Sequence, residues 1–225
     1  MSSSEEYDII IIGGGVIGCS IARALCKYDL KVCLLEKEAD ISMGTTKGNS
    51  GVVHAGYASS RTYVKRDLCI RGNKLFTQAA KELNFPFKRI GSFVVAVEPD
   101  QIKDLDEDRK KGIEDGIHGL ELILDKDRIK KMEPNITDDV IGVLHAPTAG
   151  LVSPYEFTFA LAENAAMNGV KFFRNNEVIK INHRDYIFTV TTKRGEFIGR
   201  NVINCAGLYA GKISKMLGLD YFDIM

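Results

Sequence analysis

The chain has 225 residues, 45% of them hydrophobic and 27% charged, which is ordinary for a soluble globular protein. Lys plus Arg and Asp plus Glu each number 30, so the net charge is zero and nothing favours nucleic acid or an acidic membrane surface as a partner. No apolar run in the sequence approaches the ~20 residues of a transmembrane helix.

The N-terminal part predicts a strand, a helix and a second strand. Residues 7–12 form a branched apolar run, which is typical of a strand buried on both faces of a parallel sheet. Ile17, Ile21 and Leu25 recur at helical spacing, so an amphipathic helix is expected after this strand. Residues 31–36 predict the next strand, which ends on Glu36.

Gly13, Gly15 and Gly18 fit the pattern G-x-G-x-x-G between the first strand and the helix. In dinucleotide-binding folds the first glycine permits the tight turn, the second lets backbone approach a pyrophosphate, and the third lets the helix pack closely on the strand. The helix N-terminus offers unpaired N–H groups to the phosphates, and Glu36 is placed to accept hydrogen bonds from a ribose. A carboxylate there repels a 2′-phosphate, which disfavours NADP. The alternative is a tight strand–helix turn in an ordinary α/β protein.

Residues 44–57 are rich in glycine and small polar side chains, and are too polar and interrupted for a core element. Such a segment lets the backbone approach a flat, polar ligand and offers many small hydrogen-bond donors. A surface loop is the alternative interpretation.

The rest of the chain predicts helices and short strands. The apolar face of a helix at 63–83 is expected to comprise Leu68, Leu75, Phe76, Ala79 and Leu83. Further helices are predicted at 101–116, 125–133, 153–168 and 208–217, and strands at 91–97, 121–124, 140–145, 170–173, 178–183, 186–192, 197–198 and 201–204. After the last strand, Ala206 and Gly207 suit a second approach of bare backbone to the same nucleotide, although a plain strand–helix turn explains them equally well.

The five cysteines are odd in number and form no C-x-x-C motif, so we interpret them as small buried residues in a reducing compartment. The four histidines are scattered, and no metal site is predicted. The N-terminus lacks the basic and apolar regions of a signal peptide, so a cytoplasmic location is expected.

The whole chain resembles the N-terminal part of the FAD-dependent oxidoreductases of the D-amino-acid-oxidase (DAO) superfamily. Within it, the segment Asn-Ser-Gly-Val-Val-His-Ala-Gly at 49–56 is similar to that of FAD-dependent glycerol-3-phosphate dehydrogenases and oxidases, and residues 87–92 and 204–207 continue the match. The resemblance implies an α/β fold: a Rossmann-like FAD-binding domain of the GR2/DAO type with part of a second, mixed-sheet substrate domain. The expected FAD-binding parts are 1–90 and 151–225, with 91–150 as the inserted substrate portion.

The resemblance also implies which residues contact FAD. Gly13, Gly15 and Gly18 would hold the pyrophosphate, and Glu36 the adenosine ribose. Thr45, Thr46, Asn49 and Ser50 would line the path from the pyrophosphate to the flavin, the backbone of Val178 would meet the adenine, and Val16, Ile17, Lys37, Ala206 and Gly207 would complete the cofactor site.

His54 would lie by the flavin as the base that takes the substrate hydroxyl proton. Oxidation of a secondary alcohol requires loss of a proton from oxygen as hydride leaves carbon, and histidine titrates in the useful range. The cofactor itself accepts the hydride.

The implied reaction is oxidation of sn-glycerol 3-phosphate to dihydroxyacetone phosphate, with oxygen or a quinone as the electron acceptor. Two alternatives remain: oxidation of L-2-hydroxyglutarate, because that relative carries a Gly-Val-x-His-Ala-Gly type segment, and a dinucleotide-binding module without catalysis. The C-terminal portion of the family is missing here. The chain by itself is therefore expected to be inactive, and its exposed apolar surface is expected to favour association with a second copy.

Overall fold

The computed structural model describes residues 5–58, 64–220, 222 and 224. The chain divides into two units: unit 1 comprises Met1–Ser50 and Ser153–Met225, and unit 2 comprises Gly51–Val152. The boundary expected at residue 90 differs from this division, because β3 (Val52–Val53) and β4 (Phe87–Lys88) both pair with β8 (Gly150–Val152). The roles of the two units as cofactor and substrate domains stay predictions.

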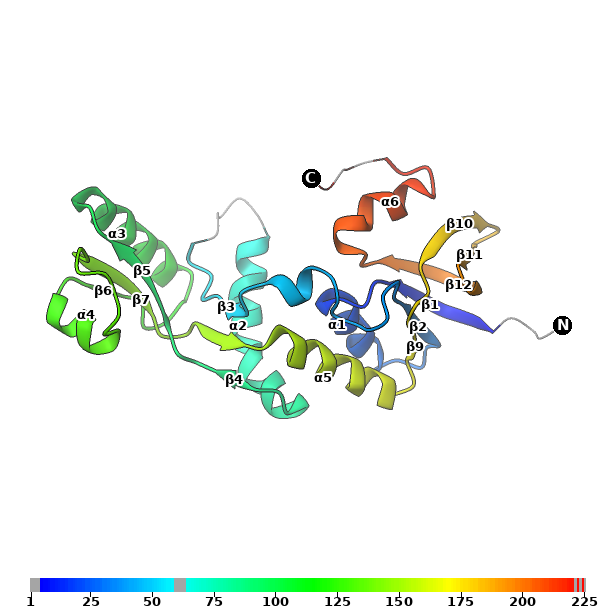
Figure 1. Ribbon diagram of the computed structural model, residues 1–225, viewed down its shortest axis with the longest axis horizontal. Helices are drawn as coiled ribbons and strands as arrows, with labels where there is room; N and C mark the ends of the chain where they lie inside the picture. The colour runs from blue at the N-terminus through cyan, green and yellow to red at the C-terminus, as the bar shows by residue number, and fades with distance from the viewer. Residues whose placement is uncertain (1–4, 59–63, 221, 223, 225) are drawn as a thin grey trace. The chain divides into compact units, whose positions relative to one another are not determined.

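Unit 1 is built on a six-stranded mixed sheet with flanking helices (Figure 1). In spatial order the strands are β10 (Val178–Arg184), β11 (Ile187–Thr192), β12 (Gly195–Asn204), β1 (Glu6–Ile12), β2 (Val32–Leu35) and β9 (Lys171–Phe173), and the helices are α1 (Val16–Leu25), α5 (Pro154–Met167) and α6 (Ala210–Lys215). The strands from β12 to β9 are parallel to one another, whereas β10, β11 and β12 form an antiparallel meander. The parallel β1–α1–β2 connection confirms the predicted Rossmann-like α/β arrangement.

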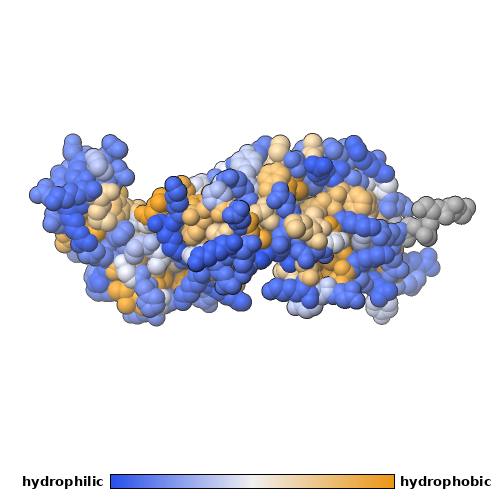
Figure 2. Space-filling view, turned by 90° about the horizontal axis from the view of Figure 1, so that it is seen from below, coloured by the Kyte–Doolittle hydropathy of each residue, from blue (hydrophilic) through white to orange (hydrophobic). Residues whose placement is uncertain are grey.

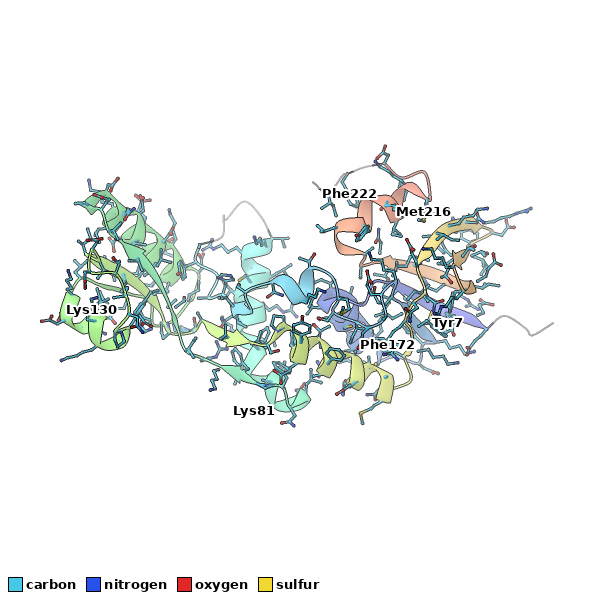
Figure 3. The ribbon with its side chains drawn as sticks, viewed as in Figure 1. Tyr7, Lys81, Lys130, Phe172, Met216 and Phe222 are labelled. Carbon is cyan, nitrogen blue, oxygen red and sulfur yellow. The ribbon has the colours of Figure 1, made fainter. Side chains whose placement is uncertain are left out.

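The central strand β1 is buried on both faces, as its run of branched residues predicts. Ile10 and Ile12 share a core with Ile213 of α6, and Met216, labelled in Figure 3, packs against that core. Because successive side chains of a strand point to opposite faces, the fully buried Ile11 points to the other face, where α1 packs. Figure 1 shows α1 and α5 side by side, with α6 away from them.

Helix α1 is confirmed, but its buried face differs from the predicted one. The buried residues are Gly18, Cys19 and Ala22, whereas Ile17 is 62% exposed and Ile21 is only partly buried. Small residues form this face because α1 approaches both the sheet and α5 closely, and large apolar side chains would hold the helix away.

The described residues of unit 2 form two antiparallel three-stranded sheets and three helices. One sheet has the order β3–β8–β4, and the other has the order β5 (Ser92–Ala96), β7 (Gly142–Ala146), β6 (Glu121–Ile123); the helices are α2 (Lys65–Leu83), α3 (Pro99–Glu114) and α4 (Lys126–Met132). Leu105 of α3 shares a core with Leu144, and Ile129 of α4 shares another with Val143, so α3 and α4 cover opposite faces of β7. Figure 2 shows that the face of the α3–α4 region turned to the viewer is largely hydrophilic.

Helix α2 is also confirmed, although residue 63, its predicted start, lies outside the described residues. Leu68 and Leu75, predicted as part of its apolar face, are 56% and 54% exposed, while Arg66 and Asn73 are buried. The reason is that these two polar side chains find partners inside unit 2: Arg66 pairs with Asp115, and Asn73 binds backbone carbonyls.

The other predicted elements are confirmed with small shifts at their ends, with two further differences. The strands predicted at 197–198 and 201–204 form one strand, β12, because the residues between them pair with β1 and β11. The helix predicted at 208–217 begins as a 3-10 turn, η2 (Gly207–Tyr209), before α6.

Candidate functional site

A cavity of about 700 Å³ lies in unit 1, where the parallel strands β1, β2 and β12 end. Ligands of open α/β sheets bind outside the carboxyl ends of the strands, which is this edge. The predicted cofactor residues that line the cavity are Gly13, Gly15, Val16, Ile17, Glu36, Lys37, Thr45, Thr46, Asn49, Val178, Ala206 and Gly207. Gly18 and Ser50 are not part of this lining.

The turn between β1 and α1 requires glycine at two positions. Gly13 has a φ of +111°, and a Cβ there would overlap the carbonyl of Cys205. A Cβ on Gly18 would overlap the carbonyl oxygen of Gly13. Gly18 therefore acts beneath the cavity, where it lets α1 reach the turn, and this is why it does not line the wall.

The N-terminus of α1 presents its backbone N–H groups beside the cavity. The Val16 N–H donates to Thr46 Oγ1 at 3.0 Å, and the Gly14 N–H donates to Glu36 Oε2 at 2.6 Å. Within the described residues, no hydrogen bond engages the N–H groups of Gly15 and Ile17. These two donors, with the partial positive charge of a helix N-terminus, suit an anionic group such as a phosphate.

Thr46 lies in η1 (Thr45–Gly48), and its hydroxyl caps a helix thirty positions earlier in the chain. Replacing Thr46 with valine is expected to destabilise the protein by about 0.5–2 kcal/mol, because it removes an N-cap acceptor. Urea unfolding curves measure this difference. Thr46→Ser, which keeps the hydroxyl, is the matched control, and equal stability of the valine and serine variants would contradict the capping role.

Glu36 is 8% exposed and uses both carboxylate oxygens. Oε2 accepts from the Gly14 N–H at 2.6 Å, and Oε1 accepts from the Glu38 N–H at 2.9 Å. Each carboxylate oxygen keeps a further lone pair for a ligand hydroxyl. Glu36 therefore fixes the glycine turn and also faces the cavity in which the ribose is predicted.

Replacing Glu36 with glutamine puts an NH₂ group against one of these two N–H donors. We expect a loss of about 1–3 kcal/mol in the free energy of unfolding, because a buried donor loses its charged acceptor. Glu38→Gln is the control, since the Glu38 side chain pairs with Lys37 near the surface and its loss should cost about 0.5 kcal/mol or less. An E36Q variant as stable as E38Q would show that these bonds contribute little.

The structure adds lining residues that the sequence did not indicate, among them Asn176, Tyr209 and Lys212. Lys37 Nζ lies 3.9 Å from the centre of the Tyr209 ring, so the end of β2 and η2 meet at the cavity. The sequence could have indicated Tyr209 and Lys212, because they follow the predicted cofactor residue Gly207 within one or two helical turns. Lys37, which the resemblance implied as a cofactor residue, lines the cavity together with Tyr209.

The cysteines are free thiols, of which Cys19 and Cys33 are buried and Cys26, Cys69 and Cys205 partly buried. Burial raises the pKa of Cys19 and Cys33 to about 12 and also raises the pKa of Cys205, which lines the cavity. These three thiols stay protonated at neutral pH and act as small apolar side chains. All five cysteines were predicted to be buried, and the structure confirms this for Cys19 and Cys33 alone.

His54 belongs to unit 2, where it directly follows β3 and is exposed. Its backbone carbonyl accepts a hydrogen bond from Asn73 Nδ2 at 3.0 Å. The role of its imidazole in proton transfer stays a prediction.

Among the described residues, no group of three or more His, Cys, Asp or Glu side chains is arranged to hold a metal ion. The helices in the same part of the chain are all too short or too polar to cross a bilayer.

Comparison with known proteins gives a family and several relatives. The family described as "FAD dependent oxidoreductase" (DAO) matches residues 8–224. The chain is 45% identical over 219 residues to a glycerol 3-phosphate dehydrogenase of Caloramator mitchellensis, covering 97% of this chain and 45% of that protein. It is 33% identical over 220 residues to the L-2-hydroxyglutarate dehydrogenase of Escherichia coli, covering 95% of this chain and 50% of that protein.

Among solved structures, the fold is similar to L-α-glycerophosphate oxidase from Mycoplasma pneumoniae with FAD bound. The TM-score is 0.89 at 30% identity, and the match covers 94% of this chain and 57% of that one. The chain spans about half the length of the curated relatives it matches.

Proposed function

The chain belongs to the family of FAD-dependent oxidoreductases, and we propose that the whole protein oxidises sn-glycerol 3-phosphate to dihydroxyacetone phosphate. The observation that carries the proposal is the 45% identity to a glycerol 3-phosphate dehydrogenase over 97% of this chain. The M. pneumoniae glycerophosphate oxidase, with its TM-score of 0.89, supports the same class of substrate.

The cavity of unit 1 fits FAD. The N–H groups of Gly15 and Ile17 suit the pyrophosphate, and a side chain at position 15 would intrude between this turn and Thr46, which lies 3.1 Å from where its Cβ would be. The free lone pairs of Glu36 suit the ribose hydroxyls. Val178, at the start of β10, lines the same cavity and suits the adenine. We assign Ala206 and Gly207 to the near side of the cofactor.

His54 is proposed as the base of the reaction. When bound, FAD accepts the hydride that leaves the carbon of the alcohol. The imidazole of His54 takes the proton of the hydroxyl oxygen, so the alcohol loses one hydride and one proton and becomes the carbonyl product. The sequence supports this role for His54, because His54 follows Asn49, a residue of the cavity wall, by five positions.

The test is the absorption spectrum of the purified full-length protein. A bound flavin whose absorbance is bleached by anaerobic sn-glycerol 3-phosphate is the expected result. A protein without flavin, or a flavin that stays oxidised with this substrate, would overturn the proposal.

L-2-hydroxyglutarate is the second candidate substrate, because relatives with that activity in their names are 30–33% identical to this chain. Anaerobic reduction by each compound in turn separates the two. Reduction by the hydroxy acid alone would replace the first proposal with this one.

Readmission of oxygen to the reduced protein, with a soluble quinone as the comparison, identifies the electron acceptor. We also propose a cytoplasmic location, which the free thiols support. Association with a second copy stays a prediction that the molecular mass in solution tests.

A further inference from the structure

The buried amide of Asn73 lies beneath His54 in unit 2. Asn73 is on α2 and is 6% exposed, and its Nδ2 donates to two backbone carbonyls, His54 O at 3.0 Å and Thr148 O at 2.9 Å. An NH₂ group has two hydrogens, so both carbonyls are satisfied at once. One side chain thus joins the segment that carries His54 to the turn between β7 and β8.

Arg89 fixes which way this amide points. Its guanidinium donates to Asn73 Oδ1 at 3.0 Å and to Asn73 O at 2.7 Å, and it also reaches Thr148 O. A guanidinium has only donors and a carbonyl only acceptors, so the amide oxygen must face Arg89 and the NH₂ group must face the carbonyls. Asparagine is suited to this place because it offers an acceptor on one side and two donors on the other.

The hydrogen bonds of Arg89 show that its role is structural. Its Nε donates to Thr77 Oγ1 at 3.1 Å, so each nitrogen of the guanidinium has a partner within unit 2. Its positive charge polarises the Asn73 amide and strengthens the N–H bonds to the carbonyls. Arg89 therefore acts on His54 through Asn73.

The backbone around His54 is held on both sides of this carbonyl. Val53 pairs with Gly150 in the β3–β8 ladder, and Ala55 is 4% exposed. Gly56 has a φ of +110°, and a Cβ there would be 2.6 Å from the side chain of Ile70 on α2. His54 is thus an exposed residue between anchored neighbours, and the carbonyl bond fixes the peptide plane that orients its Cα–Cβ bond.

We infer that Asn73, oriented by Arg89, is a positioning residue for the His54 base. The inference rests on the proposed function, because holding His54 in place affects the reaction only if His54 transfers a proton. A displacement of about 1 Å in a reacting group can cost 10²-fold in rate, which sets the size of the expected effect.

The test compares full-length variants Asn73→Asp, Arg89→Lys and Thr77→Val. N73D keeps an acceptor for Arg89 but loses both donors, and R89K keeps the charge but loses the fork that holds the amide. T77V is the matched control, because it removes one bond of Arg89 without touching the amide. If N73D does not fold, R89K carries the test.

The first readout is the rate constant of flavin reduction by saturating anaerobic sn-glycerol 3-phosphate and, separately, L-2-hydroxyglutarate, per bound flavin. We expect N73D to lower this rate constant by about 10- to 100-fold and R89K to lower it less, with KM little changed and T77V like the wild type. A merely structural role would lower the yield of folded protein and leave the rate per bound flavin unchanged, which would overturn the inference.

The second readout is hydrogen–deuterium exchange of peptides that cover residues 50–58. Faster exchange in N73D but not in T77V is expected, since the segment loses its anchor. Unchanged exchange in N73D would also overturn the inference.

The two proposals fail differently. A slow His54→Ala variant together with a fast N73D variant contradicts only the role of Asn73. A fast H54A variant, or a flavin reduced by neither substrate, contradicts the proposed chemistry. The positioning role of Asn73 then fails with it.

Discussion

The protein with alanine at position 18 is expected to purify without FAD. The new Cβ would overlap the carbonyl oxygen of Gly13, which is backbone and cannot rotate away, so α1 must move off the turn. The N–H groups of Gly15 and Ile17 would then leave the place where the pyrophosphate is proposed to bind. Overpacking of this kind costs about 3 kcal/mol, so the Tm should fall as well.

The measurements are the flavin-to-protein absorbance ratio and the Tm of the full-length protein. Gly72→Ala is the matched control, because Gly72 also lies within a helix but a Cβ there meets no other atom within 4 Å. That control should keep its flavin and be slightly stabilised, by about 0.5–1 kcal/mol. A G18A variant with a full complement of FAD would refute the tight contact of α1 with the turn.

Removal of the His54 imidazole is expected to slow flavin reduction by sn-glycerol 3-phosphate by about 10²- to 10⁴-fold, the usual contribution of a positioned general base. Added imidazole should restore part of the rate of H54A, because it supplies the missing base. Anaerobic stopped-flow reduction with and without added imidazole measures both effects.

His183→Ala is the control for this experiment, since His183 lies on β10 in unit 1 and stacks on Phe188 with ring centres 4.2 Å apart. Its reduction rate should match that of the wild type. If H54A keeps the wild-type rate, another group takes the proton.

The glycine turn could be predicted because its signal is local. Gly13, Gly15 and Gly18 stand directly after a branched run, and the following strand ends on Glu36, so the order of elements and the chemistry agree within a short stretch. The structure brings the predicted segments to one cavity for the same reason: parallel strands end at a common edge.

The partners inside the site could not be predicted in this way. The sequence indicates that Thr46 is polar and near the ligand, but nothing in it shows that the hydroxyl caps α1 at Val16. The buried face of α2 was missed because hydrophobic periodicity favours Leu68 and Leu75 over Asn73, whose partners are 19 and 75 positions away. Pairings at such separations depend on tertiary structure, which a pattern within one helix does not contain.

The interruption of unit 1 by unit 2 has a consequence for how the protein is made. During translation, β1 and β2 leave the ribosome early. The strand β12, which flanks β1 on its other side, follows much later, since Ile12 pairs with Asn204, some 190 positions further along the chain. All of Gly51–Val152 is synthesised before β12 and can fold while the first strand still has an unpaired edge. The nascent chain therefore acquires its nucleotide cavity only after residues 205–213 have emerged, and until then the exposed edge of β1 is a segment that a chaperone would need to cover.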